Sequence, residues 1–583
     1  MNFQNREILW EPSPDQSENS QMAQFIGFVN RKHSLSFQNY NDLYVWSITH
    51  NSAFWETIWH FSKIIASQQY LSVVSDPGKM PGAKWFPSAR LNFAENLLRY
   101  RDPHPALIFQ GEGLSPISLT YKDLHDKVRN VSQGLRALGV EPGDRIVGFM
   151  PNLPETVIAM LAATAIGAIW SSCSPDFGIK GVLDRFSQIQ PKIIFSADGY
   201  RYNGKPFDSL EKLQGILKEL PSIEQVIITS YLNKEPNLNK IPNAISYEDF
   251  SKPRKNRETD LIFEQLPFDH PLYIMYSSGT SGLPKSIVHG AGGTLIQHLK
   301  ELQLHTDITR DDVIFYYTTC GWMMWNWLIS SLAVGATIVL YDGSPFHPGP
   351  DALWKMANDL KITIFGTSAK YISACEAAAV QPATRFKLKN LRSILSTGSP
   401  LVEENFDYIY RDVKTSVQLS SISGGTDIIS CFALGNPMLP VRRGELQCRG
   451  LGMNVKSFST SGKSLIGEKG ELVCTSAFPS MPIYFWNDRD SQKYLNAYFR
   501  KYKNIWHHGD YISISTDGGV KIFGRSDATL NPGGVRIGTA EIYRVVDTLA
   551  GISDSLVIGQ PWADDERIIL FVKLVDGTSL DDE

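Results

Sequence analysis

Leu272-Tyr-Ile-Met-Tyr-Ser-Ser-Gly-Thr-Ser-Gly-Leu-Pro-Lys285 begins with an apolar and aromatic run that predicts a buried strand. The nine residues after it, 277–285, hold four hydroxyl side chains, two glycines and a lysine. Glycine lets the backbone approach an anion, N–H groups and hydroxyls donate to phosphate oxygens, and lysine supplies the countercharge. The Walker spacing is absent, because Leu283 and Pro284 follow Gly282. A phosphate-binding loop is therefore predicted. The alternative is a mobile Ser/Gly surface loop, which is disfavoured because the loop directly follows a buried strand and has a lysine after its proline.

Short apolar runs and helical periods alternate on both sides of this strand. Further strands are predicted at 145–150, 192–196, 225–229, 362–365 and 391–395. Helices are predicted at 121–138, closed by Gly139 as a C-cap, and at 154–168, with Pro154 in its first turn. Continuous apolar strands that alternate with helices imply parallel sheets covered on both faces, so the predicted fold class is α/β.

The character of the chain changes near Arg443. Segments bounded by glycine, at 444–447, 470–473 and 519–523, predict the strands of a β-rich subdomain. We therefore expect a large domain at 1–525, made of parallel-sheet subdomains and this β-rich subdomain, with 1–100 as an N-terminal extension packed on it. A small mobile α+β lid is expected at 526–583, and the polar stretch 233–257 is expected to be a surface connection.

Composition excludes several classes of protein. Hydrophobic residues make up 43% of the 583 residues, which is enough for a large core and too much for a disordered chain. Lysine and arginine number 56 against 60 acidic residues, a formal net charge of -4. Because no global positive field exists to hold a nucleic-acid backbone, no nucleic-acid partner is expected, and an anionic ligand needs a local site.

The cysteines and the apolar stretches indicate where the chain resides. Its six cysteines show no metal-binding or redox pair spacing, which fits a reducing compartment. The N-terminus lacks the basic start and apolar run of a signal peptide, so a cytoplasmic location is expected. The uncharged stretch 322–341 is long enough to span a membrane, but polar residues and Gly335 divide it, and we interpret it as a buried helix followed by a strand. The oligomeric state is not indicated.

Residues 277–285 resemble the signature loop of the acyl-adenylating superfamily, which contains acyl-CoA synthetases, peptide-synthetase adenylation domains and firefly luciferase. Residues 85–86 and 91–96 are similar to the N-terminal motif of the short-chain acyl-CoA synthetases. Segments 199–205, 319–327, 423–427 and 479–483 resemble the acetoacetate-activating members. The resemblance implies small-molecule substrates: acetoacetate, ATP with Mg²⁺, and CoA. In the implied reaction the acid attacks the α-phosphorus of ATP, and the CoA thiol then displaces AMP.

The resemblance also implies the residues of the nucleotide site. Thr426 would contact the α-phosphate, Asp427 would hold Mg²⁺ although the family pattern has the longer Glu, and Arg536 would lie near the phosphate. The implied ATP-binding residues are Ser277, Ser278, Gly279, Thr280, Ser281, Gly282, Lys285, Gly398, Ser399, Pro400, Ser423, Gly425, Asp510 and Arg525. His507 and His508 are adjacent and are interpreted as structural.

The acyl pocket departs from that of the acetate enzymes. Acetyl-CoA synthetases place a tryptophan two positions before the threonine of this motif, where the present chain has Gly424. The absent indole is expected to leave room for acetoacetate, since one aromatic side chain buries about 150–250 Å². Gly424→Trp is accordingly expected to favour acetate. The other expected lining residues are Trp322, Met323, Met324 and Trp325.

For CoA, the resemblance implies contacts from Arg201 and Lys205 with the nucleotide phosphates and from Gly533 and Gly534 beside the pantetheine tunnel. Asp527 would be the hinge of the lid.

The lid is expected to be truncated. A final Pro-Lys/Arg-Thr-x-Ser-Gly-Lys-like motif, whose lysine serves adenylation in the family, is not present. Lys573 lies in an apolar strand and Lys463 in a hairpin-like turn before the hinge, so neither is taken as that lysine. A weakened adenylation step is therefore expected. Two alternatives stay open: a CoA ligase for another short-chain acid, and a nucleotide-binding pseudoenzyme.

Overall fold

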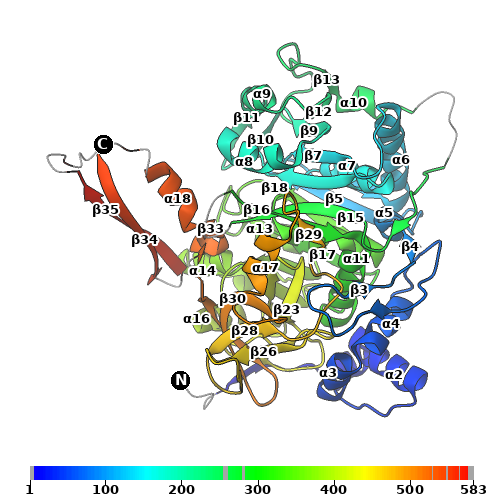
Figure 1. The fold of residues 1–583 in the computed structure, drawn as a ribbon, viewed down its shortest axis with the longest axis vertical. Helices are drawn as coiled ribbons and strands as arrows, with labels where there is room; N and C mark the ends of the chain where they lie inside the picture. The colour runs from blue at the N-terminus through cyan, green and yellow to red at the C-terminus, as the bar shows by residue number, and fades with distance from the viewer. Residues whose placement is uncertain are drawn as a thin grey trace.

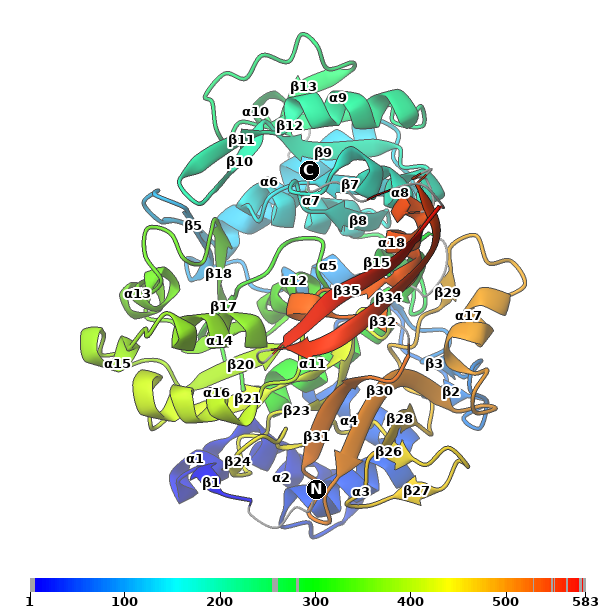
Figure 2. The same cartoon turned by 90° about the vertical axis from the view of Figure 1, so that its left-hand side faces the viewer.

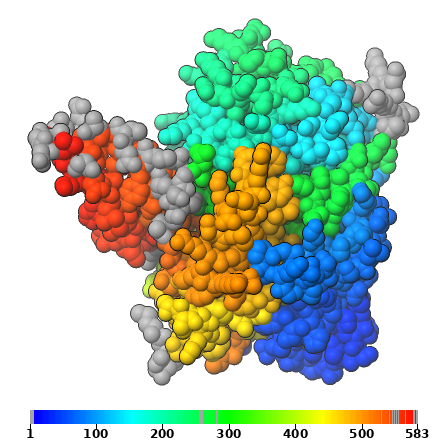
Figure 3. Space-filling view, in the orientation of Figure 1, coloured from blue at the N-terminus to red at the C-terminus, as the bar shows by residue number. Residues whose placement is uncertain are grey.

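The computed structural model describes residues 6–253, 260–278, 283–527, 529–546, 549, 551–562, 565–575 and 579. Figure 1 shows a large body that contains the N-terminus and the sheets, and a smaller C-terminal unit that projects from one side of it. In the space-filling view this red unit stands beside the orange surface of the β-rich part (Figure 3).

Two large sheets form the body. The first has eight strands in the order β13-β12-β9-β7-β8-β15-β16-β29, and the second has seven in the order β21-β20-β19-β17-β18-β5-β6. The strands of the first are β13 (Ala244–Ser246), β12 (Gln225–Thr229), β9 (Ile193–Ala197), β7 (Arg145–Phe149), β8 (Ile169–Cys173), β15 (Pro271–Ser277), β16 (Lys285–Gly290) and β29 (Tyr484–Phe485). The strands of the second are β21 (Gln418–Ser421), β20 (Ser393–Thr397), β19 (Ile364–Ser368), β17 (Val313–Tyr316), β18 (Thr337–Asp342), β5 (Pro105–Gly111) and β6 (Ile117–Thr120).

Both sheets are parallel except at one edge. In the first sheet β15 pairs antiparallel with β16, and β16 pairs antiparallel with β29. In the second sheet β6 is the antiparallel edge strand. The predicted parallel sheets are thus present, but each carries an antiparallel edge, a common arrangement in α/β proteins.

Helices cover the sheets and connect their strands. Their bounds are α6 (Tyr121–Ala137), α7 (Pro154–Ala165), α8 (Ile179–Ile189), α9 (Leu210–Glu219), α10 (Tyr247–Phe250), α11 (Ala291–Leu299), η1 (Lys300–His305), α12 (Met323–Ile329), η2 (Ser330–Ala333), α13 (Ala352–Asp359), α14 (Ala369–Ala377), α15 (Pro382–Arg385), α16 (Glu403–Tyr408) and η3 (Ile409–Val413). The left-handed backbone of Gly139, φ +70°, ends α6 as predicted. Residues 322–341 form α12, η2 and β18, which confirms the buried helix and strand.

The β-rich part is a five-stranded sheet in the order β27-β26-β28-β30-β31. Its strands are β26 (Val455–Phe458), β27 (Ser464–Leu465), β28 (Gly470–Cys474), β30 (Trp506–Ile514) and β31 (Val520–Arg525), with α17 (Gln492–Tyr498) between β29 and β30. A smaller sheet joins β22 (Ser423–Gly425), β23 (Ser430–Leu434) and β25 (Cys448–Arg449). The strand predicted at 444–447 is wrong, because these residues form only an isolated bridge from Leu446 to Val520.

The N-terminal helices pack against the body. They are α1 (Pro14–Asn19), α2 (Gln21–His33), α3 (Tyr40–Thr49), α4 (Asn51–Phe61) and α5 (Phe93–Leu97). Trp59 of α4 stacks on Phe86 with ring centroids 4.7 Å apart. The Tyr44 hydroxyl donates to the carbonyl of Met453 at 3.0 Å, so helices from the start of the chain are fastened to the β-rich part. Short strands β1 (Ile8–Trp10) and β24 (Val441–Arg442) pair across the same boundary.

The C-terminal unit contains β32 (Thr529–Leu530), η4 (Pro532–Gly534), β33 (Ile537–Gly538), α18 (Thr539–Val546), β34 (Ile552–Trp562) and β35 (Asp565–Leu574). The ribbon in Figure 2 shows β34 and β35 as a long red hairpin crossing the face of the body. The division of the chain at 525/526 stays a prediction, and β31 ends at Arg525.

Two further expectations concern the environment of the chain. No described helix is both long and apolar enough to cross a membrane. All six cysteines are among the described residues, and each is buried and free.

Candidate active site

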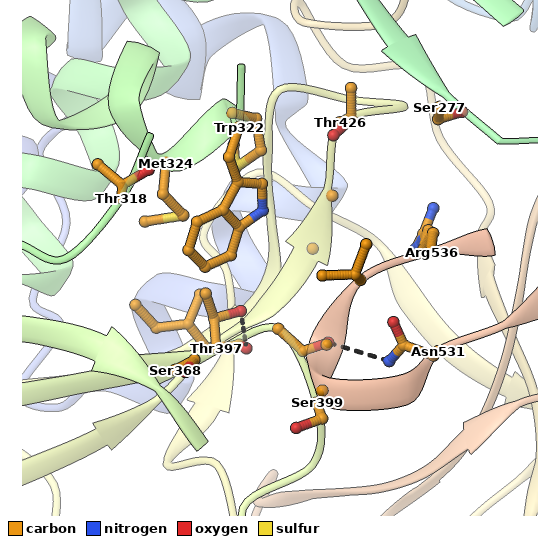
Figure 4. Close-up of a pocket in the computed structure, with 18 of the residues that line it drawn as sticks. Ser277, Thr318, Trp322, Met324, Ser368, Thr397, Ser399, Thr426, Asn531 and Arg536 are labelled. Carbon is orange, nitrogen blue, oxygen red and sulfur yellow. Dashed lines mark hydrogen bonds between the residues drawn. The ribbon is translucent and has the colours of Figure 1, made fainter. Parts of the chain in front are cut away.

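A cavity of about 450 Å³ opens where strands of both sheets end. Its walls come from the carboxyl ends of β15, β20 and β21, the start of α12, the β22–β23 turn, and the C-terminal unit. Ligands of open α/β sheets bind at such strand ends. Figure 4 shows Trp322 and Met324 on one side of this space and Asn531 and Arg536 on the other.

Asp427 is the centre of a charged cluster beside the cavity. Its side chain is 2% exposed, and its two oxygens accept from different donors. Oδ1 accepts from Lys285 Nζ at 2.7 Å and from the Tyr498 hydroxyl at 2.5 Å. Oδ2 accepts from Arg536 Nη1 at 2.6 Å. The guanidinium of Arg536 thereby joins the C-terminal unit to the β22–β23 turn, and Asp427 continues the connection to Lys285 at the start of β16.

Burial and the neighbouring cations together set the ionisation of Asp427. Burial opposes ionisation of Asp427, but Lys285 and Arg536 outweigh it and hold the pKa of the carboxyl well below its usual value. His508 lies beside them, with Nε2 at 3.3 Å from Arg536 Nη2, and burial lowers the pKa of this imidazole to about 4. At neutral pH the cluster therefore holds a carboxylate, two cations and a neutral histidine.

The end of β20 meets the C-terminal unit directly. Asn531 Nδ2 donates to the carbonyl of Gly398 at 3.0 Å. A Cβ built on Gly534 would lie 2.9 Å from the carbonyl carbon of Gly398, and Gly534 has a φ of +80°. Glycine is therefore required there for both space and conformation. Ser399 and Pro400 follow Gly398 in the cavity wall.

Asp510 and Arg525 form the next part of the wall. Arg525 Nη1 donates to Asp510 Oδ1 at 3.0 Å, and its other nitrogens reach Asp527. Although burial opposes it, Arg525 lowers the pKa of Asp527. The predicted ribose carboxylate and the predicted hinge residue thus share one arginine.

The apolar end of the cavity contains Trp322, Met323 and Met324, as predicted. Trp325 was predicted to line it and does not. It is a fully buried residue of α12, and its Nε1 donates to Asn152 Oδ1 at 2.9 Å.

Gly424 lies in the cavity wall, but not for the predicted reason. A Cβ on Gly424 would stand 2.0 Å from the carbonyl oxygen of Ser430 and 2.7 Å from Cys431 Cα. Any side chain at this position is directed into β23, so Gly424→Trp would collide with backbone before it filled the cavity. The glycine is explained by the close approach of β22 to β23.

The other predicted residues are distributed around this centre. Ser277, Ser278, Ser423, Gly425 and Thr426 line the cavity, as do Gly533 and Gly534. Gly279, Thr280, Ser281 and Gly282 lie outside the described residues. Arg201 and Lys205 are on a separate hairpin, β10 (Gly199–Tyr202) with β11 (Lys205–Asp208), and do not line the cavity. Lys463 lies in the turn between β26 and β27, as expected.

Sequence reasoning missed several members of the site. Tyr498 and Asn531 were assigned no role, and His508 was interpreted only as structural. The hydroxyl of Tyr498 reaches Asp427 across 71 residues of chain, which no local pattern reveals. His508 could have been weighed more heavily, because it directly precedes the predicted Gly509-Asp510 pair.

A protein-built metal centre has no support in the described part of the chain, which holds no cluster of three or more His, Cys, Asp or Glu suited to a metal ion. Both oxygens of Asp427 are already engaged by cations and a hydroxyl. Mg²⁺ usually binds through one or two carboxylates and the phosphates of its nucleotide.

The fold and the cavity define an AMP-binding enzyme. The family model described as AMP-binding enzyme matches residues 93–484, and the model described as acetyl-coenzyme A synthetase N-terminus matches residues 40–97. Such enzymes use ATP, and the CoA ligases among them also use CoA.

Individual relatives narrow the class. Acetoacetyl-coenzyme A synthetase of Rhizobium meliloti is 50% identical over 573 residues, which cover 98% of this chain and 87% of the relative. Acetoacetyl-CoA synthetase of Danio rerio is 49% identical over 585 residues, which cover 99% of this chain and 87% of the relative. A solved acetoacetyl-CoA synthetase from Streptomyces lividans superposes with a TM-score of 0.86 at 42% identity, covering 99% of this chain and 88% of that one. The chain belongs to the acetoacetyl-CoA synthetase family.

These comparisons do not support the expected truncation of the lid; the match to the relative from Rhizobium meliloti takes in 98% of this chain and 87% of the relative. They also do not favour the pseudoenzyme alternative, because the matched relatives are synthetases.

Proposed function

We propose that this chain ligates acetoacetate to CoA at the expense of ATP, through an acetoacetyl-adenylate, with release of pyrophosphate and AMP. The observation that carries the proposal is 50% identity with an acetoacetyl-coenzyme A synthetase along 98% of the chain. The cavity is consistent with it, because an apolar end with Trp322 and Met324 adjoins a charged cluster at Asp427.

In the first step, the carboxylate of the acid attacks the α-phosphorus and pyrophosphate leaves. We assign Lys285 and Arg536 to the negative charge of the phosphates, since Arg536 lines the cavity and Lys285 bonds the same carboxylate, that of Asp427. Thr426, Ser277 and Ser278 line the same wall and offer hydroxyl donors. Phosphoryl chemistry of this kind depends mostly on positioning and on charge stabilisation.

Magnesium enters as part of the nucleotide substrate, where it neutralises phosphate charge. Asp427 is the carboxylate we assign to it, by exchange of one of its present cations. Asp510 is assigned to the ribose hydroxyls, held in orientation by Arg525.

In the second step, the CoA thiol attacks the acyl carbon and AMP leaves. The β10–β11 hairpin with Arg201 and Lys205 stands apart from the cavity, where it can meet the distant phosphates of CoA. Glu112 fixes this hairpin, because its carboxylate accepts from the backbone N–H groups of Asn203 and Gly204. Movement of the C-terminal unit about Asp527 between the two steps is part of the proposal.

A second candidate substrate is malonamate. A relative named malonamoyl-CoA synthetase from Penicillium aethiopicum is 42% identical over 97% of this chain and 81% of the relative. Malonamate and acetoacetate both carry a carbonyl at the β position, so the same pocket is a reasonable host for either.

The test is acid-dependent AMP formation by the purified chain with MgATP and CoA. Acetoacetate, malonamate, butyrate and acetate are compared by kcat/KM, and acetoacetate is expected to give the highest value. If MgATP binds in a calorimeter but no acid yields AMP or a thioester, the chain is a nucleotide-binding protein and the proposal is wrong.

A further inference from the structure

The segment that carries Thr426 and Asp427 is fastened to the body by buried polar side chains. Residues 426–435 run from the β22–β23 turn through β23 and cross β16, α11 and η1; Figure 2 shows α11 next to β23. His289 bonds the carbonyl of Thr426 at 2.9 Å, and His298 bonds that of Ile429 at 2.7 Å. His305 bonds the carbonyl of Gly435 at 2.9 Å.

Glu301 occupies the middle of this series. Its Oε1 accepts from the Ser430 hydroxyl and from the Cys431 backbone N–H, the latter at 3.1 Å. Its Oε2 accepts from Trp327 Nε1 at 2.9 Å. Lys300 Nζ lies 3.2 Å from Oε1, and both side chains are 0% exposed. A buried carboxylate is costly to maintain, and this one has every oxygen engaged, so its position is tightly specified.

The two residues that Glu301 bonds in β23 belong to the cavity wall. Ser430 and Cys431 line the same cavity as Trp322 and Met323, and they pair with β22 at Gly424 and Gly425. The backbone of Ser430 is already in close contact with Gly424, where an added Cβ would lie 2.0 Å from the Ser430 oxygen. A shift of residues 430 and 431 would therefore move this part of the cavity wall, and Gly424 with it. A π-helical segment such as η1, which bears Glu301, is often found at functional sites.

We propose that Glu301 is a positioning residue that holds Ser430 and Cys431 in place, and that it thereby sets the depth of the acyl end and the preference among short-chain acids. The proposal rests on the proposed ligase function. Glu301 itself does not line the cavity, so it acts through β23.

The first experiment measures acyl preference in Glu301→Gln. The amide cannot accept at both ends, so either Trp327 or the pair Ser430 and Cys431 loses its partner. The ratio of kcat/KM for acetoacetate to that for acetate is expected to change about tenfold, the effect of losing one hydrogen bond to a charged group. The change should lie in the KM for the acid, while the KM for ATP stays within about twofold of the wild type.

Two further variants keep this test decisive. Asp312→Asn is the matched control, because Asp312 is also a buried carboxylate that does not line the cavity, and it bonds Thr309, Thr363 and Arg392, the last at 2.9 Å. It should cost stability without changing acyl preference. Ser430→Ala removes only one of the bonds to Glu301 and is the variant to use should Glu301→Gln fail to fold; a smaller change in the same ratio is expected.

A readout that needs no ligase activity separates this inference from the proposed function. Burial and the charge of Glu301 raise the pKa of the Cys431 thiol. Alkylation of Cys431 by iodoacetamide, followed by mass spectrometry with buried Cys375 as the internal reference, should be faster in Glu301→Gln and Ser430→Ala than in the wild type and in Asp312→Asn. An unchanged acyl ratio together with unchanged Cys431 alkylation in both folded variants would overturn the proposal. If the wild type forms no thioester but Cys431 is alkylated faster in the variants, the proposed function is wrong and the positioning role is supported.

Discussion

Gly424 is a residue whose importance lies in backbone contact. The Cβ of an alanine there would approach the Ser430 oxygen to 2.0 Å, closer than any real contact, so β22 and β23 must separate to admit it. We expect Gly424→Ala to lower the free energy of unfolding by about 1–3 kcal/mol, as overpacking does, and to raise the KM for acetoacetate. Urea denaturation and steady-state kinetics measure both effects.

The control for this substitution is Gly78→Ala, because a Cβ on Gly78 meets nothing within 4 Å. It should leave stability and KM unchanged. If Gly424→Ala is as stable as the wild type and merely gains activity with acetate, the earlier interpretation of this glycine as an opening left by an absent indole is restored.

Tyr498 offers a second test at this scale. Its hydroxyl donates to Asp427 at 2.5 Å, and its ring stacks on Trp506 with centroids 3.9 Å apart. Tyr498→Phe keeps the stacking and removes the donor, so Asp427 loses one of the groups that orient it. A hydrogen bond to a charged group is worth about 1.5–3 kcal/mol, so AMP formation is expected to slow by at least about tenfold.

Tyr494→Phe is the matched control, since Tyr494 lies one turn earlier in α17 and is also buried. Pyrophosphate exchange dependent on acetoacetate isolates the adenylation step. Equal exchange rates in the two variants would show that the hydroxyl of Tyr498 has no part in orienting Asp427.

At the scale of elements, the contact between η4 and the end of β20 decides how closely the C-terminal unit approaches the body. Gly534→Ala would push a methyl group to 2.9 Å from Gly398, whereas a Cβ on Gly533 meets nothing within 4 Å. Both glycines have positive φ, +80° and +60°, so the backbone strain of the two substitutions is similar.

Gly534→Ala is therefore expected to lower AMP formation well below the level of Gly533→Ala. The larger loss follows from displacement of Asn531 and Arg536, which bond Gly398 and Asp427. Limited proteolysis should cut the chain after Arg525 faster in Gly534→Ala. Equal activity and equal cleavage in the two variants would mean that this close contact does not matter for the reaction.

The same scale shows why some elements could be predicted and others could not. The strand β15 was found because its apolar run is uninterrupted and a glycine-rich loop ends it. The antiparallel strand β16 was not predicted at all, because its sequence Lys-Ser-Ile-Val-His-Gly contains only two adjacent apolar residues. Residues 444–447 were taken as a strand from flanking glycine alone, although they pair only through one bridge. Pairing partners are set by tertiary contacts, which local periodicity does not contain.

For the site, the sequence predicted the residues that occur in motifs. Asp427, Arg536 and Lys285 were all identified, and the structure brings them into one cluster. The sequence did not predict that Lys285 and Arg536 bond Asp427 itself. It also missed Glu301 and Tyr498, which occur in no motif and reach the site from distant elements.

At the scale of the whole molecule, the buried histidines make stability depend on pH. His289, His298, His305 and His508 are fully buried, and burial lowers their pKa values to about 4, 4, 3 and 4. In the unfolded chain each would titrate near its ordinary value of about 6.5. Between these two limits the unfolded state binds more protons than the folded state, so stability rises with pH and falls as the pH drops from about 6.5 toward 4.

Each such histidine contributes a slope of up to about 1.4 kcal/mol per pH unit in that window. We therefore expect the thermal midpoint to be nearly constant from pH 8 to 7 and to fall steeply from pH 6.5 to 5. His305→Gln is the informative variant, because its amide can both donate to Gly435 and accept from Leu451, as the neutral imidazole does. Its midpoint should decline less steeply over the same window, measured by differential scanning calorimetry at fixed ionic strength. A wild-type midpoint that is flat down to pH 5 would show that these imidazoles admit a proton without unfolding.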